Sequence, residues 1–404
     1  MAAEDTPENL ILDVGPAVHG GHCLARHEGR VVFVRHAIPG ERARVHLTEQ
    51  RRKGYWRGDA VEILDVSPDR VPSVWPEAGP GGVGGGELAH VRPEAQRTWK
   101  RDVLLDALTR IGKLDTEDPL LEALTVEAVP GNADGLGTRT RIELTTDGAG
   151  RAGMFRHRTH EVVALREMPL AVPEIAGLDL LGRTWEPGVR IDAVAPSDGD
   201  PVVLVNGRPW RGGRTHVRER VAAAESEYRY RLAAHGFWQI HRAAPTTLVD
   251  AVLAAAQLNP GSSVIDAYSG AGLLSLPLAD AVGPNGFVLA IEADQQASRD
   301  ARRNAHGLDQ LELRTGEVAP TLAGVERRPD AVVLDPPRAG AGPDVLNRLA
   351  ELGTPRVVYV ACDPAALARD IRTTLDLGYR LEALRAFDLF PHTHHVEALA
   401  TLVR

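Results

Sequence analysis

From about residue 231 to the end of the chain, short apolar segments alternate with amphipathic ones, and this alternation constrains the fold most. The apolar segments predict strands in SSVIDAY, GFVLAIEAD, LELRTG, PDAVVLDPP and RVVYVACDP. Helical spacing between them predicts helices at about 271–282, 295–305, 344–352 and 364–376. Such alternation is typical of a doubly wound, mostly parallel sheet covered on both faces. The tail, YRLEALRAFDLF and HVEALATLVR, predicts a closing antiparallel pair. We therefore expect a Rossmann-like α/β domain over 231–404.

The first 230 residues lack this alternation and predict two further domains. Residues 8–66 contain several short strands separated by turns, which favours a small β-barrel of the OB type. Helical spacing follows at about 94–112 and stops at Gly112. Mixed strands between 125 and 230 predict an α+β central domain. We expect domains at 1–66, 67–230 and 231–404, with the helix near 94–112 packed on the last of them.

Composition excludes several classes of protein. Two cysteines in 404 residues argue against a disulfide framework and against an all-cysteine metal site. No apolar run approaches membrane-spanning length, and MAAEDTPENL lacks the features of a signal peptide. We therefore expect a soluble, cytoplasmic protein that does not contact a membrane. We also expect it to act as a monomer.

The net charge of −9 argues mildly against a nucleic-acid partner, but basic residues are clustered. Nine of them lie in one short stretch: Arg26, Arg30, Arg35, Arg42, Arg44, Arg51, Arg52, Lys53 and Arg57. Tyr55 and Trp56 are interleaved with them. Arginines and aromatic rings in this arrangement suit a groove that follows a nucleic-acid backbone, although a solvated structural domain is the plainer interpretation.

The segment DAYSGAG at 266–272 follows a predicted strand and opens a helix. Gly270 and Gly272 allow a ligand to approach the backbone closely, and Glu292 ends the next strand, where a carboxylate can hold both ribose hydroxyls. A glycine pattern alone is often only a tight turn. Because Ser275 stands where a dinucleotide site has its third glycine, and Asp266 precedes the loop, the pattern fits S-adenosylmethionine better than a pyrophosphate.

Two more strand ends carry reactive groups. One strand is stopped sharply by Asp335-Pro336-Pro337-Arg338, which would direct the Asp335 and Arg338 side chains toward the same edge of the sheet. The alternative is an ordinary strand end with a surface arginine. Cys362 ends the next strand, where the dipole of the following helix would favour a thiolate. A small buried side chain is the alternative for this cysteine.

Glu397 lies where the chain enters its last strand, close to His392, His394 and His395. By itself Glu397 would be a solvated charge. The three histidines suggest a metal site, but their spacing does not place them on one helical face and no second ligand group is evident. We therefore expect no metal.

These motifs together resemble the S-adenosylmethionine-dependent RNA uracil-C5 methyltransferases, of the bacterial 23S ribosomal RNA type with an N-terminal TRAM domain. The resemblance covers nearly the whole chain. ARHEGRVVFVRHAIPGERARV resembles the TRAM barrel, and FWQIH, DAYSGAG, LDPPRAG, YVACDPAALARD and FPHTHHVE match the catalytic motifs in order.

The resemblance implies a role for each matching residue. Cys362 would be the nucleophile and Glu397 the base, with Arg338 on the substrate side. The cofactor site would be formed by Gln239, Tyr268, Gly270, Gly272, Glu292, Asp335 and, by a looser match, Glu317. The implied cofactor is S-adenosyl-L-methionine, and the implied partner is RNA.

The chain departs from the family in one structural respect. Many relatives bind an iron–sulfur cluster through four cysteines, whereas the matching positions here are Trp75, Val83, Gly86 and Met168. We therefore expect no iron–sulfur cluster. His241 and the sequence Ala-Cys-Asp-Pro also differ from the usual Asn and Ser-Cys-Asn-Pro.

The sequence therefore predicts a methyltransferase that forms 5-methyluridine in structured RNA, with 23S ribosomal RNA preferred to transfer RNA. Two alternatives are an exocyclic-amine methyltransferase, which needs no thiol, and a non-catalytic RNA-binding module, which would not bind S-adenosylmethionine.

Overall fold

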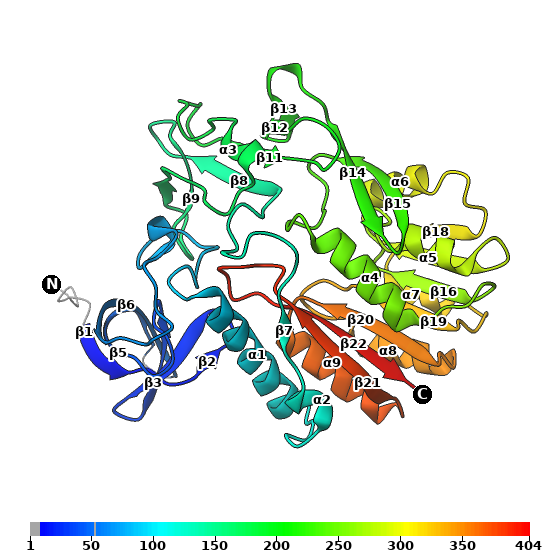
Figure 1. Cartoon of the computed structure of the whole chain (residues 1–404), viewed down its shortest axis with the longest axis horizontal. Helices are drawn as coiled ribbons and strands as arrows, with labels where there is room; N and C mark the ends of the chain where they lie inside the picture. Colours follow the sequence, from blue (N-terminus) through cyan, green and yellow to red (C-terminus); the bar gives the residue numbers. More distant parts are fainter. Residues whose placement is uncertain (1–8, 52–53) are drawn as a thin grey trace.

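Three sheets and one hairpin make up the chain in the computed structural model, which describes residues 9–51 and 54–404 (Figure 1). Two residues of the basic cluster, Arg52 and Lys53, lie outside the described residues. None of the described helices combines the length and apolar content that crossing a bilayer requires.

The N-terminal sheet has six strands in the order β1-β5-β6-β4-β3-β2. Its strands are antiparallel except for the parallel pair β4 and β6. Their side chains alternate between exposed and buried positions along β1 and β5, so that one face encloses an apolar core that includes Leu12, Val32 and Val45. The strands are β1 (Asn9–Asp13), β2 (Ala17–Val18), β3 (His22–His27), β4 (Arg30–Arg35), β5 (Arg42–Gln50) and β6 (Trp56–Asp65).

The segment between the N-terminal sheet and the central sheet packs on the C-terminal domain. After the short turn η1 (Pro76–Ala78), helix α1 (Pro93–Arg110) begins with proline in its first turn and packs against α9. Helix α2 (Pro119–Glu122) follows, and β7 (Val126–Glu127) adds a parallel edge strand to β21 of the C-terminal sheet.

The central sheet is antiparallel, in the order β10-β9-β8-β11-β12-β13. Its elements are β8 (Arg141–Thr146), β9 (Ala152–Phe155), β10 (Val162–Ala164), α3 (Pro173–Ala176), β11 (Arg190–Val194), β12 (Val202–Val205), β13 (Arg208–Pro209) and η2 (Trp210–Gly212).

Strands β14 (His216–Ala223) and β15 (Ser226–Ala233) form a separate hairpin. All of β14 and most of β15 lie in the segment assigned above to the central domain, yet the hairpin packs against α4 and α6 of the C-terminal domain. Tyr230 and Leu232 share an apolar cluster with Val264 of β16.

The C-terminal sheet has the order β18-β17-β16-β19-β20-β22-β21-β7, with β16 to β20 parallel and β22 antiparallel to both neighbours. This confirms the doubly wound α/β fold. Two apolar clusters cover its faces, because successive residues such as Val264 and Ile265 point to opposite sides. The strands are β16 (Ser263–Ala267), β17 (Phe287–Glu292), β18 (Leu311–Thr315), β19 (Ala331–Leu334), β20 (Arg356–Ala361), β21 (Arg380–Phe387) and β22 (Glu397–Val403).

Six helices connect these strands or lead into them: α4 (Ala244–Ala256), α5 (Ser275–Val282), α6 (Gln295–Asn304), α7 (Val318–Ala323), α8 (Gly342–Glu351) and α9 (Pro364–Asp376). Helix α5 begins at Ser275 rather than at about 271, because the glycine loop occupies the intervening residues as a turn. Helices α4 and α7 were not among the predicted helices.

Candidate active site

The predicted cofactor residues meet at one edge of the C-terminal sheet. Ala267, the last residue of β16, lies opposite Ile291 of β17 and Leu334 of β19. The next residue on each strand is Tyr268, Glu292 and Asp335 respectively, so their backbones stand side by side. Strand order reverses between β16 and β19, and open α/β sheets bind ligands outside the strand ends at such a reversal.

The glycine loop leaves room beside these strand ends. Gly270 and Gly272 have φ values of 58° and 92°, in the region that favours glycine, and no atom lies within 4 Å of where a Gly270 Cβ would stand. The Gly270 N–H donates to one carboxylate oxygen of Glu292 at 2.8 Å, and the Asp294 N–H donates to the other at 2.6 Å. These two bonds hold the Glu292 carboxylate at the loop.

Asp266 connects the end of β16 to the start of α5. It is fully buried, and the Ser275 hydroxyl at the start of α5 donates to it. Burial raises the pKa of Asp266 to about 7; the Ser275 bond opposes this rise, and the charges of Asp335 and Glu292 add to it. Its Oδ1 atom has no hydrogen-bond partner among the described residues. A buried polar atom without a partner at the base of an open loop suits a site that receives a polar ligand.

Glu317 and Gln239 stand in different surroundings. Glu317 precedes α7 with an exposed side chain that makes no cap bond, and it is near enough to Tyr268 to contribute to raising the pKa of that phenol to about 12, after burial and Asp370. Gln239, in the β15–α4 loop, lines a cavity of about 220 Å³ together with Glu219 of β14 and Thr140, the residue before β8. Its role in cofactor binding stays a prediction.

Cys362 and Glu397 lie next to each other at the ends of the adjacent antiparallel strands β20 and β22. Ala361, the end of β20, is paired with Ala398 of β22, so Cys362 is level with Glu397. The Cys362 side chain is half-buried, whereas Glu397 is 4% exposed. Burial and repulsion by Asp335 hold the pKa of Glu397 well above its usual range, and burial raises the pKa of Asp335 to about 7. The thiol and two carboxyl groups therefore form one electrostatically linked group.

The thiolate that the following helix was expected to favour at Cys362 is disfavoured overall. Burial, then Glu397 and Asp335, raise the pKa of Cys362 to about 11. The N-terminus of α9 is capped by Asp363, whose carboxylate accepts the Ala366 N–H at 2.8 Å. Desolvation and the neighbouring carboxylates outweigh the helix end.

Arg338 lies on the open side of this group. Its side chain is exposed, it lies 3.5 Å from His395 Nε2, and its positive charge lowers the pKa of Cys362 against the larger opposing effects. The Arg338 charge therefore acts on the sulfur, and its role on the substrate side stays a prediction.

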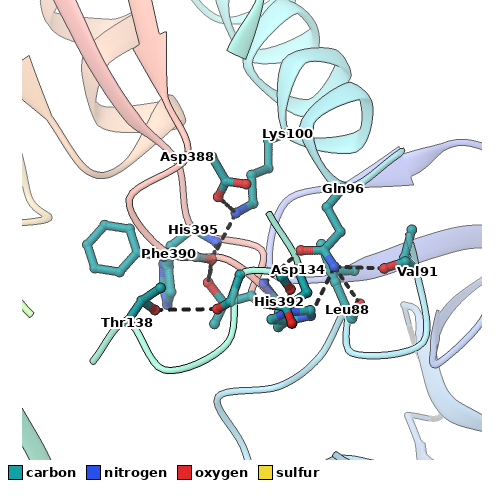
Figure 2. Close-up of polar contacts among 12 residues, drawn as sticks. Leu88, Val91, Gln96, Lys100, Asp134, Thr138, Asp388, Phe390, His392 and His395 are labelled. Carbon is teal, nitrogen blue, oxygen red and sulfur yellow. Dashed lines mark hydrogen bonds and ion pairs between the residues drawn. The ribbon is translucent and has the colours of Figure 1, made fainter. Parts of the chain in front are cut away.

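Helix α1 holds the segment that leads to Glu397 (Figure 2). The Lys100 ammonium, fully buried, donates to Asp388 at 2.5 Å and to the Phe390 carbonyl at 2.9 Å. The Gln96 carbonyl accepts the His392 N–H at 2.7 Å, and the Gln96 amide lies 3.1 Å from His392 Nδ1. Sequence reasoning missed both residues; the signal was a lysine and a glutamine on the otherwise apolar face of a helix.

The three neighbouring histidines serve as contacts within the protein. His392 Nε2 lies 2.7 Å from the Asp134 carbonyl, and the rings of His394 and His395 are tilted against each other with centroids 4.1 Å apart. His394 also lies 3.6 Å from Glu87. Across the described residues no group of three or more histidines, cysteines and acids is arranged to hold a metal ion.

The four positions that match the family's cluster cysteines lie together in the central domain. Trp75 and Val83 are buried in one apolar cluster against which Met168 packs. A Cβ on Gly86 would stand 2.8 Å from the Trp75 ring, so the missing side chain makes room for the indole. An apolar cluster thus fills this place in the chain.

Comparisons with known proteins agree with the fold and the motifs. Residues 326–404 match the family model described as tRNA (Uracil-5-)-methyltransferase. An RNA methyltransferase of Streptomyces avermitilis is 40% identical over 98% of both chains. A 23S rRNA (uracil(1939)-C(5))-methyltransferase of Alcanivorax borkumensis is 29% identical over 98% of this chain and 96% of its own. The crystal structure of Pyrococcus abyssi tRNA (uracil-54, C5)-methyltransferase with S-adenosyl-L-homocysteine has a TM-score of 0.69 at 24% identity, covering 97% of this chain and 100% of that one.

Proposed function

Because the chain belongs to the RNA methyltransferase family, we propose that it methylates C5 of a uridine in 23S ribosomal RNA through a covalent bond between Cys362 and the uracil ring. One observation carries this proposal. Cys362 and Glu397 stand level on adjacent strands, beside Asp335 at the ligand-binding edge of the sheet. An exocyclic-amine methyltransferase has no use for a thiol in that place.

The chemistry explains why a thiol and a carboxylate are both needed. C5 of uracil is a weak carbon nucleophile. Once the Cys362 thiol has released its proton to solvent, the thiolate adds to C6, the C5=C6 electron pair moves into the O4 carbonyl and C5 becomes an enolate carbon. After C5 has gained a methyl group it still carries its proton. The Glu397 carboxylate removes that proton, the electron pair re-forms C5=C6, and the Cys362 sulfur leaves.

The residues of the glycine loop fit S-adenosylmethionine, which supplies the methyl group. Glu292, fixed at the loop by the Gly270 N–H, is the carboxylate that would accept from ribose hydroxyls, and Gly270 leaves space beside the backbone. Asp335 and Asp266 are buried carboxyl groups whose pKa burial raises to about 7, so a positively charged ligand would favour their ionised forms.

The raised pKa of Glu397 suits a base that acts late in the reaction. Once Glu397 is ionised, its carboxylate, whose charge is disfavoured by burial and by Asp335, has a strong tendency to take up a proton. The pKa of about 11 for Cys362 keeps the free chain mostly in the unreactive thiol form at neutral pH. A positively charged cofactor held beside Asp335 and Glu397 would offset their negative charges and so lower the pKa of Cys362.

The choice of ribosomal over transfer RNA rests on similarity along the full chain to the Alcanivorax borkumensis enzyme, whose name gives 23S rRNA as its substrate. To reach the half-buried sulfur, the uridine has to leave its stack, so a loop or a single-stranded segment is the expected target.

The test is a map of 5-methyluridine in total RNA from cells with and without this gene, complemented by the natural chain or by Cys362→Ala. We expect one site in 23S ribosomal RNA to lose its methyl group without the gene and to regain it only with the natural chain. A lost site in transfer RNA would refute the ribosomal assignment. Methylation restored by Cys362→Ala would refute the covalent chemistry.

A further inference from the structure

The motifs LDPPRAG and YVACDPAALARD contain residues to which the proposed function gives no role. Three of them, Gly340, Tyr359 and Asp370, meet beside the candidate active site. Gly340 lies in the loop between β19 and α8, Tyr359 lies in β20, and Asp370 lies in α9. These segments are neighbours, because α9 packs against both β20 and α8 (Figure 1). The chemistry described above leaves this contact unexplained.

The buried Asp370 carboxylate is at the centre of the contact. Its Oδ2 atom accepts the Tyr359 hydroxyl at 2.5 Å and the Ala341 N–H at 2.7 Å. The Gly342 N–H lies 3.3 Å from the same oxygen, and the Ala341 N–H also reaches the Tyr359 hydroxyl oxygen at 2.9 Å. A buried carboxylate is costly unless donors surround it, and bonds to a charged acceptor are stronger than neutral ones. Asp370 therefore holds the backbone that follows Gly340.

Arg338 lies in the turn that leads to this backbone. The Gly340 N–H donates to the Pro337 carbonyl at 2.8 Å, which closes a turn with Arg338 and Ala339 in its middle. Both middle residues are exposed. The position of this turn, residues 337–340, therefore depends on β19 before it and on its contacts with α9, above all that of Asp370.

Gly340 allows the turn to approach the carboxylate closely. Its φ of 86° lies in the region that favours glycine. A Cβ at this position would stand 2.6 Å from Asp370 Oδ2 and 3.4 Å from the Ala366 Cβ. A larger residue would therefore have to displace either the turn or the carboxylate, and both displacements break the contact.

Helix α9 connects the same contact to Cys362. Cys362 stands immediately before the cap residue Asp363, and Asp370 lies about two helical turns further along. Because a packed helix moves as one element, α9 sets the position of the Arg338 turn relative to Cys362. The two are electrostatically linked: burial raises the pKa of Cys362 to about 11, and the positive charge of Arg338 opposes this rise.

We propose that Asp370, together with the Tyr359 hydroxyl, is a positioning residue for Arg338. Its carboxylate holds the turn where the Arg338 charge acts on the Cys362 sulfur. The effect on methylation rests on the function proposed above, whereas the effect on the thiol does not. A carboxylate that only stabilised the fold would change the free energy of unfolding and leave the reactivity of the thiol unchanged.

The test uses substitutions that leave every charge in place. Burial, and then the charge of Asp370, raise the pKa of Tyr268 to about 12, so replacing Asp370 itself would also alter the cofactor edge. Gly340→Ala instead pushes the turn off the carboxylate. Its matched control is Gly378→Ala, beyond the end of α9, where φ is 87° and no atom lies within 4 Å of the added Cβ.

The readout is the rate at which iodoacetamide modifies Cys362 at about pH 8, measured by mass spectrometry. We expect Arg338→Gln to slow this reaction about two- to fivefold, because it removes a charge that favours the thiolate. Gly340→Ala should slow the reaction by a similar factor, and Gly378→Ala should leave it unchanged. In an Arg338→Gln chain, Gly340→Ala should have no further effect, because the charge that it displaces is already absent.

Tyr359→Phe tests the contact without altering the backbone. It removes the hydroxyl that donates to Asp370, and it should slow the modification of Cys362 about twofold. The matched control is Tyr379→Phe. It removes a hydroxyl that donates to the Thr354 carbonyl at 2.8 Å, at the opposite end of the same sheet, and should leave the rate unchanged.

Two results would overturn the proposal. The first is an unchanged rate of Cys362 modification in Gly340→Ala. The second is a slower rate that persists when Arg338→Gln is also present, since the turn would then act by another route. If Gly340→Ala does not fold, Tyr359→Phe decides by the same two criteria.

Failure of this proposal and failure of the proposed function give different results. With RNA substrate, Gly340→Ala should lower kcat/KM by about the same factor as Arg338→Gln, and the two together should lower it no further. Calorimetry should show unchanged binding of S-adenosylmethionine. An absence of uridine methylation by the natural chain, with the thiol results intact, would refute only the proposed function.

Discussion

Replacing Glu397 by glutamine should make the Cys362 thiol more acidic. The pKa of Cys362 is about 11 against an ordinary 9.0, and burial is the largest cause, followed by Glu397 and then Asp335. At about pH 8 such a thiol is roughly 0.1% ionised, whereas an ordinary one is roughly 10% ionised. Reaction with iodoacetamide follows the thiolate fraction, so the natural chain should react about 100-fold more slowly than an ordinary thiol.

Glutamine keeps the shape of the side chain and removes its charge. We therefore expect Glu397→Gln to speed alkylation at about pH 8, but by less than the full 100-fold, because burial persists. Asp335→Asn should have a smaller effect and Asp363→Asn a smaller one still, in the order of their influence on the thiol.

The assay is the rate of carboxamidomethylation of the Cys362 peptide, followed by mass spectrometry between about pH 7 and pH 11. Cys23 supplies an internal reference, since it is fully buried and burial holds its pKa well above the usual range. An ordinary rate for Cys362 in the natural chain would contradict its raised pKa, and an unchanged profile in Glu397→Gln would show that the sulfur and this carboxyl group are not neighbours.

Three further predictions concern the parts that support the site. Lys100→Met should lower the free energy of unfolding by about 3–5 kcal/mol in urea denaturation, because Asp388 then stays buried without its partner. Adding Asp388→Leu should recover part of this loss. A Lys100→Met chain that is as stable as the natural one would contradict the ion pair. Burial raises the pKa of Asp266 to about 7, so the native state holds a proton that the unfolded chain loses near pH 4. The stability that this bound proton contributes is therefore lost as pH rises from about 4 to about 7. Asp266→Asn should raise the thermal midpoint at pH 8 but not at pH 4. Gly86→Val should lower the free energy of unfolding by about 1–3 kcal/mol, because its Cβ would stand 2.8 Å from the Trp75 ring. Gly84→Ala, whose Cβ would have its nearest contacts at 3.8 Å, should leave the free energy of unfolding unchanged in the same denaturation assay.

The doubly wound sheet could be predicted because its strands and helices differ in period. Parallel strands also share one edge for their carboxyl ends, so Tyr268, Glu292 and Asp335 could be expected to lie together from their places after three apolar runs. The start of α5 could not be placed, because helical spacing continues through the glycine loop that the backbone uses as a turn.

The supports of Glu397 could not be predicted from local sequence. Lys100 and Asp388 are 288 residues apart, and only the packing of α1 brings them together. The sign of the Cys362 pKa shift was predicted wrongly for a similar reason. The helix that follows Cys362 is visible in the sequence, whereas the depth of the site and the approach of Glu397 from β22 depend on tertiary structure.

The bond between the Cys362 sulfur and uracil C6 is tested most directly with 23S ribosomal RNA transcribed with 5-fluorouridine, because fluorine at C5 cannot leave as a proton does. After incubation with S-adenosylmethionine, denaturation and digestion, mass spectrometry should find a methylated fluorouracil nucleotide attached to Cys362. The adduct should be absent from Cys362→Ala. Methylation of ordinary uridine at C5 without any adduct to fluorinated RNA, or an adduct on another residue, would contradict the account.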